Sequence, residues 1–205
     1  MRHDSPAILL LAAGEGSRFG GAKQLANIAG EPMVRRVARM LLDIGAPVLV
    51  VTGAYADAVE AVLNDLPVSL IRCEEWQLGM GNSLATGIRA LDHVFPQATA
   101  VLVCLADQPL LDAAALRAML ERHRSAPERI LACTHAGGIQ GPPALFPRDC
   151  FSALAGLSGP HGARQLLKRE IARVEAFAAS AGIDVDAPAD LHRVRAMLGL
   201  PGEEA

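Results

Sequence analysis

The sequence predicts an α/β fold in which helices cover a mostly parallel central sheet. Its first apolar segment, residues 7–13, is a continuous aliphatic run without polar alternation, which is typical of a strand buried on both faces. Apolar runs of this kind then alternate with amphipathic segments, as in right-handed crossovers between parallel strands. Hydrophobic residues make up 51% of the chain and aromatic residues only 3%, so aliphatic side chains must fill the core.

Proline, glycine and capping residues divide the rest of the chain into elements. Further strands are expected at residues 47–52, 68–72, 99–105, 129–134 and 171–177, the last at an edge of the sheet. Helices are expected at residues 33–42, 55–63, 82–93, 112–123, 161–169 and 191–198. Pro32 and Gly45 bound the first helix, and Asn82 or Ser83 is the expected N-cap of the third. The prolines and glycines of residues 136–143 predict a flexible turn into a short extended piece, a shaped loop rather than a strand interior.

Length and composition exclude several classes of protein. The 205 residues fit one large domain, residues 1–205, with residues 1–6 as an N-terminal extension and 199–205 as a tail. A net charge of −3 does not indicate a nucleic-acid surface. The first apolar run is too short for a membrane span and has no leader-type cleavage site, so we expect a cytoplasmic protein. The four cysteines are widely spaced, which predicts reduced, buried thiols rather than a zinc site or disulfides.

The first strand runs into a glycine-rich loop that suits a polyphosphate. Gly14 and Gly16 allow backbone N–H groups to approach an anion closely. Arg18 supplies a planar fork of donors, and Lys23 supplies a compact positive charge.

Two familiar phosphate-binding motifs are excluded at this loop. A P-loop needs Gly-Lys followed by Ser or Thr, but Ala22 separates Gly21 from Lys23 and the next residue is Gln24. A dinucleotide fingerprint fails because its third glycine, Gly20, comes one residue late, and no acidic residue closes the second strand.

A carboxylate follows directly on the predicted strand at residues 99–105. Asp107 stands at its carboxyl end, where open α/β sheets bind ligands, and Pro109 ends the strand and fixes the turn. Asp107 is therefore a candidate metal ligand or catalytic group.

The glycine-rich segment and five later blocks carry a family resemblance. The run Leu11-Ala12-Ala13-Gly14-Glu15-Gly16-Ser17-Arg18, followed by Lys23, resembles the signature of nucleotidyltransferases that include sugar-nucleotide pyrophosphorylases and the molybdenum cofactor enzymes. It is most similar to the molybdenum cofactor cytidylyltransferases. The later blocks follow in family order at residues 79–84, 105–110, 141–147, 158–164 and 184–191. The resemblance covers residues 8–198 and implies a three-layer, Rossmann-like nucleotidyltransferase fold.

The resemblance implies a reaction and a set of site residues. The expected reaction transfers CMP from CTP to the phosphate of molybdopterin, releases pyrophosphate and uses Mg²⁺ or Mn²⁺. Arg18, Lys23 and Asp107 would be catalytic, and Asp107 and Asp186 would hold the metal, with Asp184 as a rival ligand. Nucleotide contacts are implied for Leu11, Ala12, Ala13, Gly14, Gly16, Ser17, Arg18, Lys23, Thr52, Gly81 and Ser83. Acceptor contacts are implied for Gly141, Pro142, Pro143, His161 and Gly162.

Three features of this assignment stay open at the level of sequence. Ala187 and Ala189 replace Thr and Glu in the family block that follows Asp186, so this block matches less closely. Ala13 stands where guanosine-using relatives carry Gly, which favours CTP over GTP. Trp76 fits either stacking on a ligand or simple packing, and Gly79 and Gly81 would let their loop close over a flat base.

Alternative functions differ in the nucleotide, the acceptor or the chemistry. The nearest are a GTP-using guanylyltransferase and a transferase acting on a sugar 1-phosphate or another small phosphate. A non-enzymatic alternative is a carrier or chaperone that delivers cofactor to a molybdenum hydroxylase. No general base is expected for the transfer reaction. The acceptor is a phosphate monoester with a second pKa of about 6, so its attacking oxygen is already anionic at neutral pH.

Overall fold

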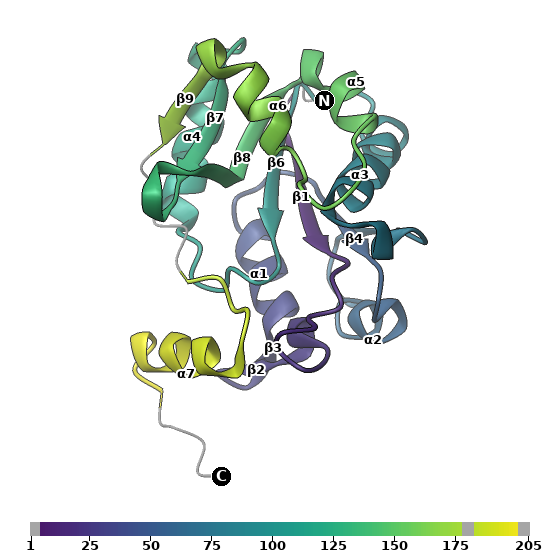
Figure 1. The fold of residues 1–205 in the computed structure, drawn as a ribbon, viewed down its shortest axis with the longest axis vertical. Coiled ribbons are helices and arrows are strands. Elements are labelled where there is room, and N and C mark those ends of the chain that lie inside the picture. Colours follow the sequence, from purple (N-terminus) through teal and green to yellow (C-terminus); the bar gives the residue numbers. More distant parts are fainter. Residues whose placement is uncertain (1–4, 178–182, 201–205) are drawn as a thin grey trace.

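The computed structural model describes residues 5–177 and 183–200. Within these residues, a seven-stranded sheet runs through the molecule in the order β5-β4-β1-β6-β8-β7-β9 (Figure 1). Its strands are β1 (Ala7–Ala12), β4 (Val48–Thr52), β5 (Ser69–Arg72), β6 (Ala100–Leu105), β7 (Ile130–Thr134), β8 (Gln140–Pro147) and β9 (Val174–Phe177). Only β8 pairs antiparallel to its neighbours, so the expected mostly parallel sheet is confirmed.

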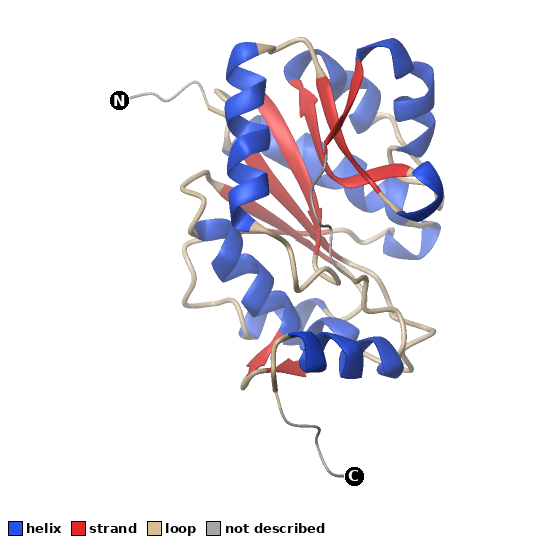
Figure 2. Ribbon diagram, turned by 90° about the vertical axis from the view of Figure 1, so that its left-hand side faces the viewer, coloured by secondary structure: helices blue, strands red, loops and turns tan. Residues whose placement is uncertain are grey.

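Helices cover both faces of this sheet (Figure 2). They are α1 (Met33–Leu42), α2 (Ala56–Ala61), α3 (Met80–Val94), α4 (Ala113–Ser125), α5 (Phe151–Ala155), α6 (Arg164–Arg169) and α7 (Pro188–Met197). Alternate side chains of β1 enter two separate cores, because successive residues of a strand point to opposite faces. Leu9 packs in the core shared with α3, α5 and α6, whereas Leu10 packs in the core shared with α1, α2 and α4. This arrangement is the three-layer fold that the sequence implied.

A small third core joins the C-terminal helix to the region after the glycine-rich loop. There the short strands β2 (Asn27–Ile28) and β3 (Glu31–Pro32) form a two-stranded ribbon next to α7 (Figure 1). Val185 and Val194 pack with Ile28, and Arg195 donates to the backbone carbonyl of Asn27 at 2.8 Å. The segment that carries Asp184 and Asp186 is thereby anchored beside the loop, although it is distant in sequence.

The prediction of a loop over residues 136–143 was wrong in its second half. β8 begins at Gln140 and lies between β6 and β7 in the sheet. Its two consecutive prolines are tolerated because they fall where the ladders are interrupted. Pairing with β6 ends at Ala144, and the register with β7 shifts between Ala144 and Gly141, so neither Pro142 nor Pro143 has to donate a ladder hydrogen bond.

The predicted start of α3 was also wrong. The helix begins at Met80 with Gly79 as its N-cap, so Asn82 and Ser83 lie inside its first turn. The Asn82 side chain makes longer-range bonds instead. Its Nδ2 donates to Glu75 Oε2 at 3.1 Å, and its Oδ1 accepts from the Gly159 amide at 2.9 Å.

Smaller differences concern the ends of elements near the C-terminus. The predicted edge strand is shorter, since residues 171–173 form a 3-10 turn before β9. The helix expected from residue 161 begins at Arg164, and the last helix begins at Pro188. Residues 1–4 and 201–205, which make up most of the expected extension and tail, lie outside the described residues.

Two expectations from composition concern cysteines and membrane spans. All four cysteines are free in the structure, and all four are buried, as predicted. Across residues 5–177 and 183–200, no helix has both the length and the apolar character needed to cross a bilayer.

Candidate active site

The site lies at the carboxyl ends of β1 and β6, which are neighbours in the sheet. Leu11 pairs with Leu105, and the Ala106 amide donates to the Leu11 carbonyl at 3.0 Å. Both strands therefore end at the same edge of the sheet. β1 leads into residues 13–22, here called the glycine loop, and β6 leads into Asp107.

The glycine loop needs glycine at residue 16 for two reasons. Gly16 has a φ of +69°, a conformation that side chains with a β-carbon rarely adopt. A β-carbon added at this residue would also lie 2.5 Å from the Gly21 carbonyl oxygen. The loop thus folds back on itself at Gly16 and turns Lys23 toward the end of β6.

Gln24 anchors the start of the glycine loop through side-chain hydrogen bonds to two backbone carbonyls. It is buried, and its Nε2 donates to the Ala12 carbonyl at 3.2 Å and also to the Gly14 carbonyl. From the sequence alone, Gln24 indicates only that the loop is not a P-loop, which would carry Ser or Thr at this position. No sequence signal identified its role, because the carbonyls it binds lie on a segment that the fold brings to it.

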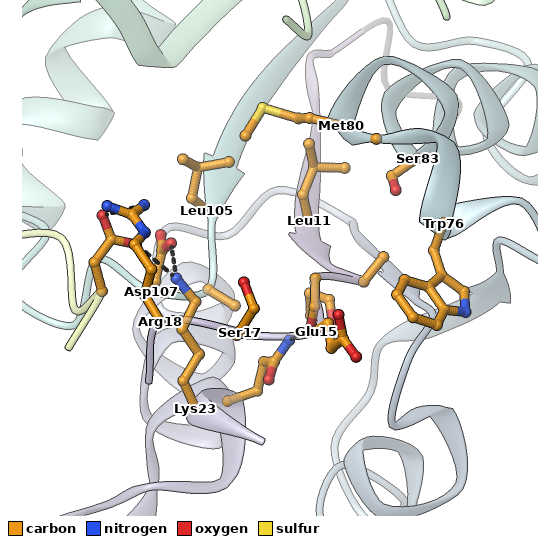
Figure 3. Close-up of a pocket in the computed structure, with 18 of the residues that line it drawn as sticks. Leu11, Glu15, Ser17, Arg18, Lys23, Trp76, Met80, Ser83, Leu105 and Asp107 are labelled. Atoms are coloured by element: carbon orange, nitrogen blue, oxygen red, sulfur yellow. Dashed lines mark hydrogen bonds and ion pairs between the residues drawn. The ribbon is translucent and has the colours of Figure 1, made fainter. Parts of the chain in front are cut away.

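Four charged side chains meet between the glycine loop and the end of β6. Lys23 Nζ lies 2.7 Å from Asp107 Oδ2 and 3.1 Å from Asp186 Oδ1. Arg18 Nη2 lies 2.9 Å from Asp186 Oδ2. The structure therefore brings together the three predicted catalytic residues and both predicted metal ligands, which come from distant parts of the chain (Figure 3 labels Arg18, Lys23 and Asp107).

Burial and charge oppose each other in this cluster. Burial raises the pKa of the Asp107 carboxyl; Lys23 acts against this shift, while the carboxylates of Asp184 and Asp186 add to it. Burial would lower the pKa of the Lys23 ammonium, but Asp107 and Asp186 outweigh it and raise that pKa above its ordinary value. Each carboxylate in the cluster is thus stabilised by a nearby positive charge.

The residues present fit a divalent cation. Asp107 Oδ1 is buried and has no hydrogen-bond partner within the described residues, so it is an acceptor that awaits a ligand. Carboxylate oxygens are the ligands that Mg²⁺ and Mn²⁺ prefer. The described part of the chain has no group of three or more His, Cys, Asp or Glu side chains that could hold a metal by itself. Asp107 and Asp186 would therefore supply two ligands and leave the other positions to phosphate oxygens and water.

The glycine loop lines a cavity of about 510 Å³, here called the loop cavity (Figure 3). Nearly all the predicted nucleotide and metal residues line it, namely Leu11, Ala12, Ala13, Gly14, Gly16, Ser17, Arg18, Lys23, Ser83, Asp107 and Asp186. Thr52 does not; it is fully buried, and its hydroxyl donates to Glu60 Oε1 at 2.8 Å. Gly81 also does not; its amide donates to the Gly159 carbonyl at 2.8 Å.

A second cavity of about 420 Å³, here called the acceptor cavity, adjoins the first. Of the predicted acceptor residues, Gly141, Pro142 and His161 line it, whereas Pro143 and Gly162 do not. Gly162 instead packs on Met80: a β-carbon there would lie 2.9 Å from the Met80 sulfur. The two cavities share Leu11, Arg18, Met80, Leu105, Asp107 and Asp186. The charged cluster therefore stands at the boundary between them.

Sequence reasoning missed two side chains of the acceptor cavity. Gln108 is fully buried, and its Nε2 donates to Asp184 Oδ1 at 3.0 Å and to the Pro142 carbonyl at 3.3 Å. His135 Nε2 lies 2.8 Å from the same carbonyl. Asp184, the rival metal ligand, is thus held by Gln108 on the acceptor side, while Asp186 faces Lys23. The only signal for Gln108 was its position directly after Asp107.

The chain matches the MobA-like NTP transferase domain over residues 8–174. The chain belongs to this family. It is also 31% identical over 205 aligned positions to the nicotine blue oxidoreductase of Paenarthrobacter nicotinovorans, covering 93% of this chain and 98% of that protein.

Solved structures agree with membership of the MobA-like NTP transferase family. Rv0371c from Mycobacterium tuberculosis H37Rv has a TM-score of 0.80 at 27% identity over 95% of this chain and 98% of that one. A complex of Rv0371c with manganese matches with a TM-score of 0.73 over 93% and 97% of the two chains. The molybdopterin-guanine dinucleotide biosynthesis protein A of Archaeoglobus fulgidus, at 16% identity and a TM-score of 0.68 over 94% and 98%, shows the same fold.

Proposed function

We propose that this NTP transferase moves CMP from CTP to the phosphate of molybdopterin and releases pyrophosphate. The observation that carries the proposal is that Arg18, Asp107 and Asp186 line both cavities. A nucleotide in the loop cavity and an acceptor in the acceptor cavity would meet at these three residues. In-line transfer between two bound phosphates requires this kind of common boundary.

The glycine loop would hold the polyphosphate of the nucleotide. Its backbone amides, the Arg18 guanidinium and the Lys23 ammonium supply donors and positive charge at one end of the loop cavity. Asp107 and Asp186 would hold a Mg²⁺ or Mn²⁺ ion, which when bound neutralises charge on the phosphates and polarises the α-phosphorus. Lys23 is placed to exchange its carboxylate partners for phosphate oxygens when the nucleotide arrives.

The bond changes are those of a simple displacement. An acceptor phosphate oxygen forms a bond to the α-phosphorus of CTP, and the bond from that phosphorus to the bridging oxygen breaks. Pyrophosphate leaves with the electron pair, and a diphosphate links the pterin to cytidine. The attacking oxygen carries no proton near neutral pH, so the chain's task is to position the reactants and neutralise their charge.

The choice of CTP rests on Ala13, which lines the loop cavity. The resemblance of Leu11-Ala12-Ala13-Gly14 to cytidine-using enzymes supports it. The reduced cysteines agree with a cytoplasmic location. Delivery of the product to a molybdenum hydroxylase is part of the same proposal.

A second candidate follows from the relative that is similar over almost its whole length. That protein's name is nicotine blue oxidoreductase, so an oxidoreduction is an alternative reaction for this chain. The cluster of Lys23, Asp107 and Asp186 favours transfer, since an oxidoreduction needs no paired carboxylates at a phosphate loop.

The test is a comparison of products with the purified chain and Mg²⁺. Molybdenum-loaded molybdopterin is incubated with CTP or with GTP, and pyrophosphate is measured. We expect release with CTP and much less with GTP. Faster release with GTP would make the enzyme a guanylyltransferase. Redox turnover of nicotine blue without pyrophosphate release would support the oxidoreductase, and tight nucleotide binding without either product would support a carrier.

A further inference from the structure

We propose that Trp76 contacts the base of the bound nucleotide and forms the end wall of the loop cavity. The proposal rests on the proposed function, because it assumes a nucleotide in that cavity. Trp76 is the single tryptophan of the chain and begins the 3-10 turn at residues 76–78, which precedes α3.

The cavity has two chemically different ends (Figure 3). Asp107, Arg18 and Lys23 lie on one side of it, and Trp76 lies on the opposite side, with Ser17 and Leu11 between them. The charged end suits the phosphates and the metal, as argued above. The base of a nucleotide whose phosphates lie there must extend toward the Trp76 end.

Trp76 lies close to Ala13, the residue that favours CTP over GTP in the family resemblance, with Gly53 packed against both. A β-carbon added at Gly53 would lie 2.9 Å from Trp76 Cβ, 2.8 Å from Ala13 Cβ and 2.6 Å from the Ala13 carbonyl oxygen. Gly53 therefore packs closely against both Ala13 and Trp76. The Ala54 amide donates to the same Ala13 carbonyl at 3.1 Å. Trp76 therefore cannot move toward Gly53 without displacing Ala13, the residue that follows β1.

The chemistry of the indole suits a base. Trp76 is half-buried and packs against the core shared with α3, and it lines the loop cavity as well as a smaller hollow beside Gly53 and Tyr55. Aromatic side chains stack on nucleobases, and the contact excludes water from both faces. Arg18 and Lys23 bind phosphate, which all nucleoside triphosphates share, so we expect base selectivity from the groups on the Trp76 side, where Figure 3 also places Glu15.

The fluorescence of this single tryptophan provides a direct test. The full-length chain with Mg²⁺ is titrated with CTP, GTP and inorganic tripolyphosphate, and binding is measured in parallel by calorimetry. Tripolyphosphate carries the charge without a base. We expect CTP to change the emission of Trp76, and tripolyphosphate to bind at the charged end without that change.

Two variants separate stacking from packing. Trp76→Ala should weaken CTP binding about 10-fold and leave tripolyphosphate binding unchanged, and Trp76→Phe should restore most of the CTP affinity. Circular dichroism checks that both variants fold. CTP binding without an emission change, together with an unchanged dissociation constant in both variants, overturns the role of Trp76 and leaves the proposed function standing. Failure of the unmodified chain to bind CTP overturns both.

Discussion

Lys23 Nζ lies 2.7 Å from Asp107 Oδ2, so the lysine that directly follows the glycine loop neutralises the carboxylate at the end of β6. Asp186 accepts from the same ammonium at 3.1 Å. These two carboxylates are the proposed metal ligands. Lys23 therefore neutralises the same two carboxylates that a divalent cation would need, and we expect the ammonium and the metal to compete for their negative charge.

Replacing Lys23 should separate metal binding from catalysis. Lys23→Met removes the competing ammonium, so Mn²⁺ binding without nucleotide should become several-fold tighter when measured by calorimetry at mildly alkaline pH. Transfer should nevertheless slow by at least about 100-fold, because a charge facing the phosphates is lost. Lys168, the other lysine of the chain, is exposed on α6, and Lys168→Met is the matched control. Weaker Mn²⁺ binding in Lys23→Met would contradict the competition.

The two candidate metal carboxylates of the C-terminal segment can be told apart by substitution. Asp186 faces Lys23, whereas Asp184 is held by Gln108. Asp107→Asn and Asp186→Asn should each lower the rate of pyrophosphate release by at least about 100-fold, because the metal clamp contributes several kcal/mol. Asp184→Asn should cost less than about 10-fold. If Asp184→Asn were the more damaging of the pair, Asp184 would be the ligand.

Close packing of two loops depends on glycine at residue 81. A β-carbon there would lie 2.7 Å from the Ser158 backbone, so Gly81→Ala must displace residues 158–160, which lead to His161. We expect the KM for the acceptor to rise several-fold, because the acceptor cavity is lined by His161. Gly156→Ala is the control, since its β-carbon would meet neighbours at an ordinary 3.7 Å. Equal kinetics for the two variants would show that the loop position is unimportant.

Protonation of a buried histidine should make stability depend on pH. Burial lowers the pKa of His123 on α4, against a smaller opposing effect of Glu128, and its Nδ1 is buried without a hydrogen-bond partner within the described residues. The unfolded chain therefore takes up the proton more readily. The free energy of unfolding should be greatest above about pH 6.5 and fall as the pH drops through the lowered pKa.

Urea unfolding between about pH 5 and 8 measures this dependence. His123→Gln should flatten the pH dependence, whereas His93→Gln, at an exposed residue of α3, should not. The same slope in His123→Gln as in the unmodified chain would assign the effect to other groups.

The elements that the sequence predicted well are those whose signal is local. β1 is a continuous aliphatic run, and it is a strand buried on both faces. β8 was missed because Pro142 and Pro143 argue against a strand, and only its pairing with β6 and β7 shows that they fall at a break in the ladder. That break is a property of three strands together.

The same distinction applies to the site. Asp107 was predictable from its place at the end of an apolar run, since strand ends collect at one edge of a parallel sheet. The roles of Gln24 and Gln108 were not, because each binds carbonyls or a carboxylate that tertiary structure brings to it. Asn82 looked like a helix cap, and its true partners, Glu75 and Gly159, flank the helix start from both sides.

We propose that the acceptor receives the α-phosphate of CTP at the boundary of the two cavities. The most direct measurement incubates the chain, Mg²⁺ and molybdenum-loaded molybdopterin with CTP labelled at the α-phosphorus, and follows the label. We expect label in the pterin product, equimolar pyrophosphate, and loss of both in Asp107→Asn. Label that remains in CTP or appears only as free CMP, with an unmodified pterin, would contradict it.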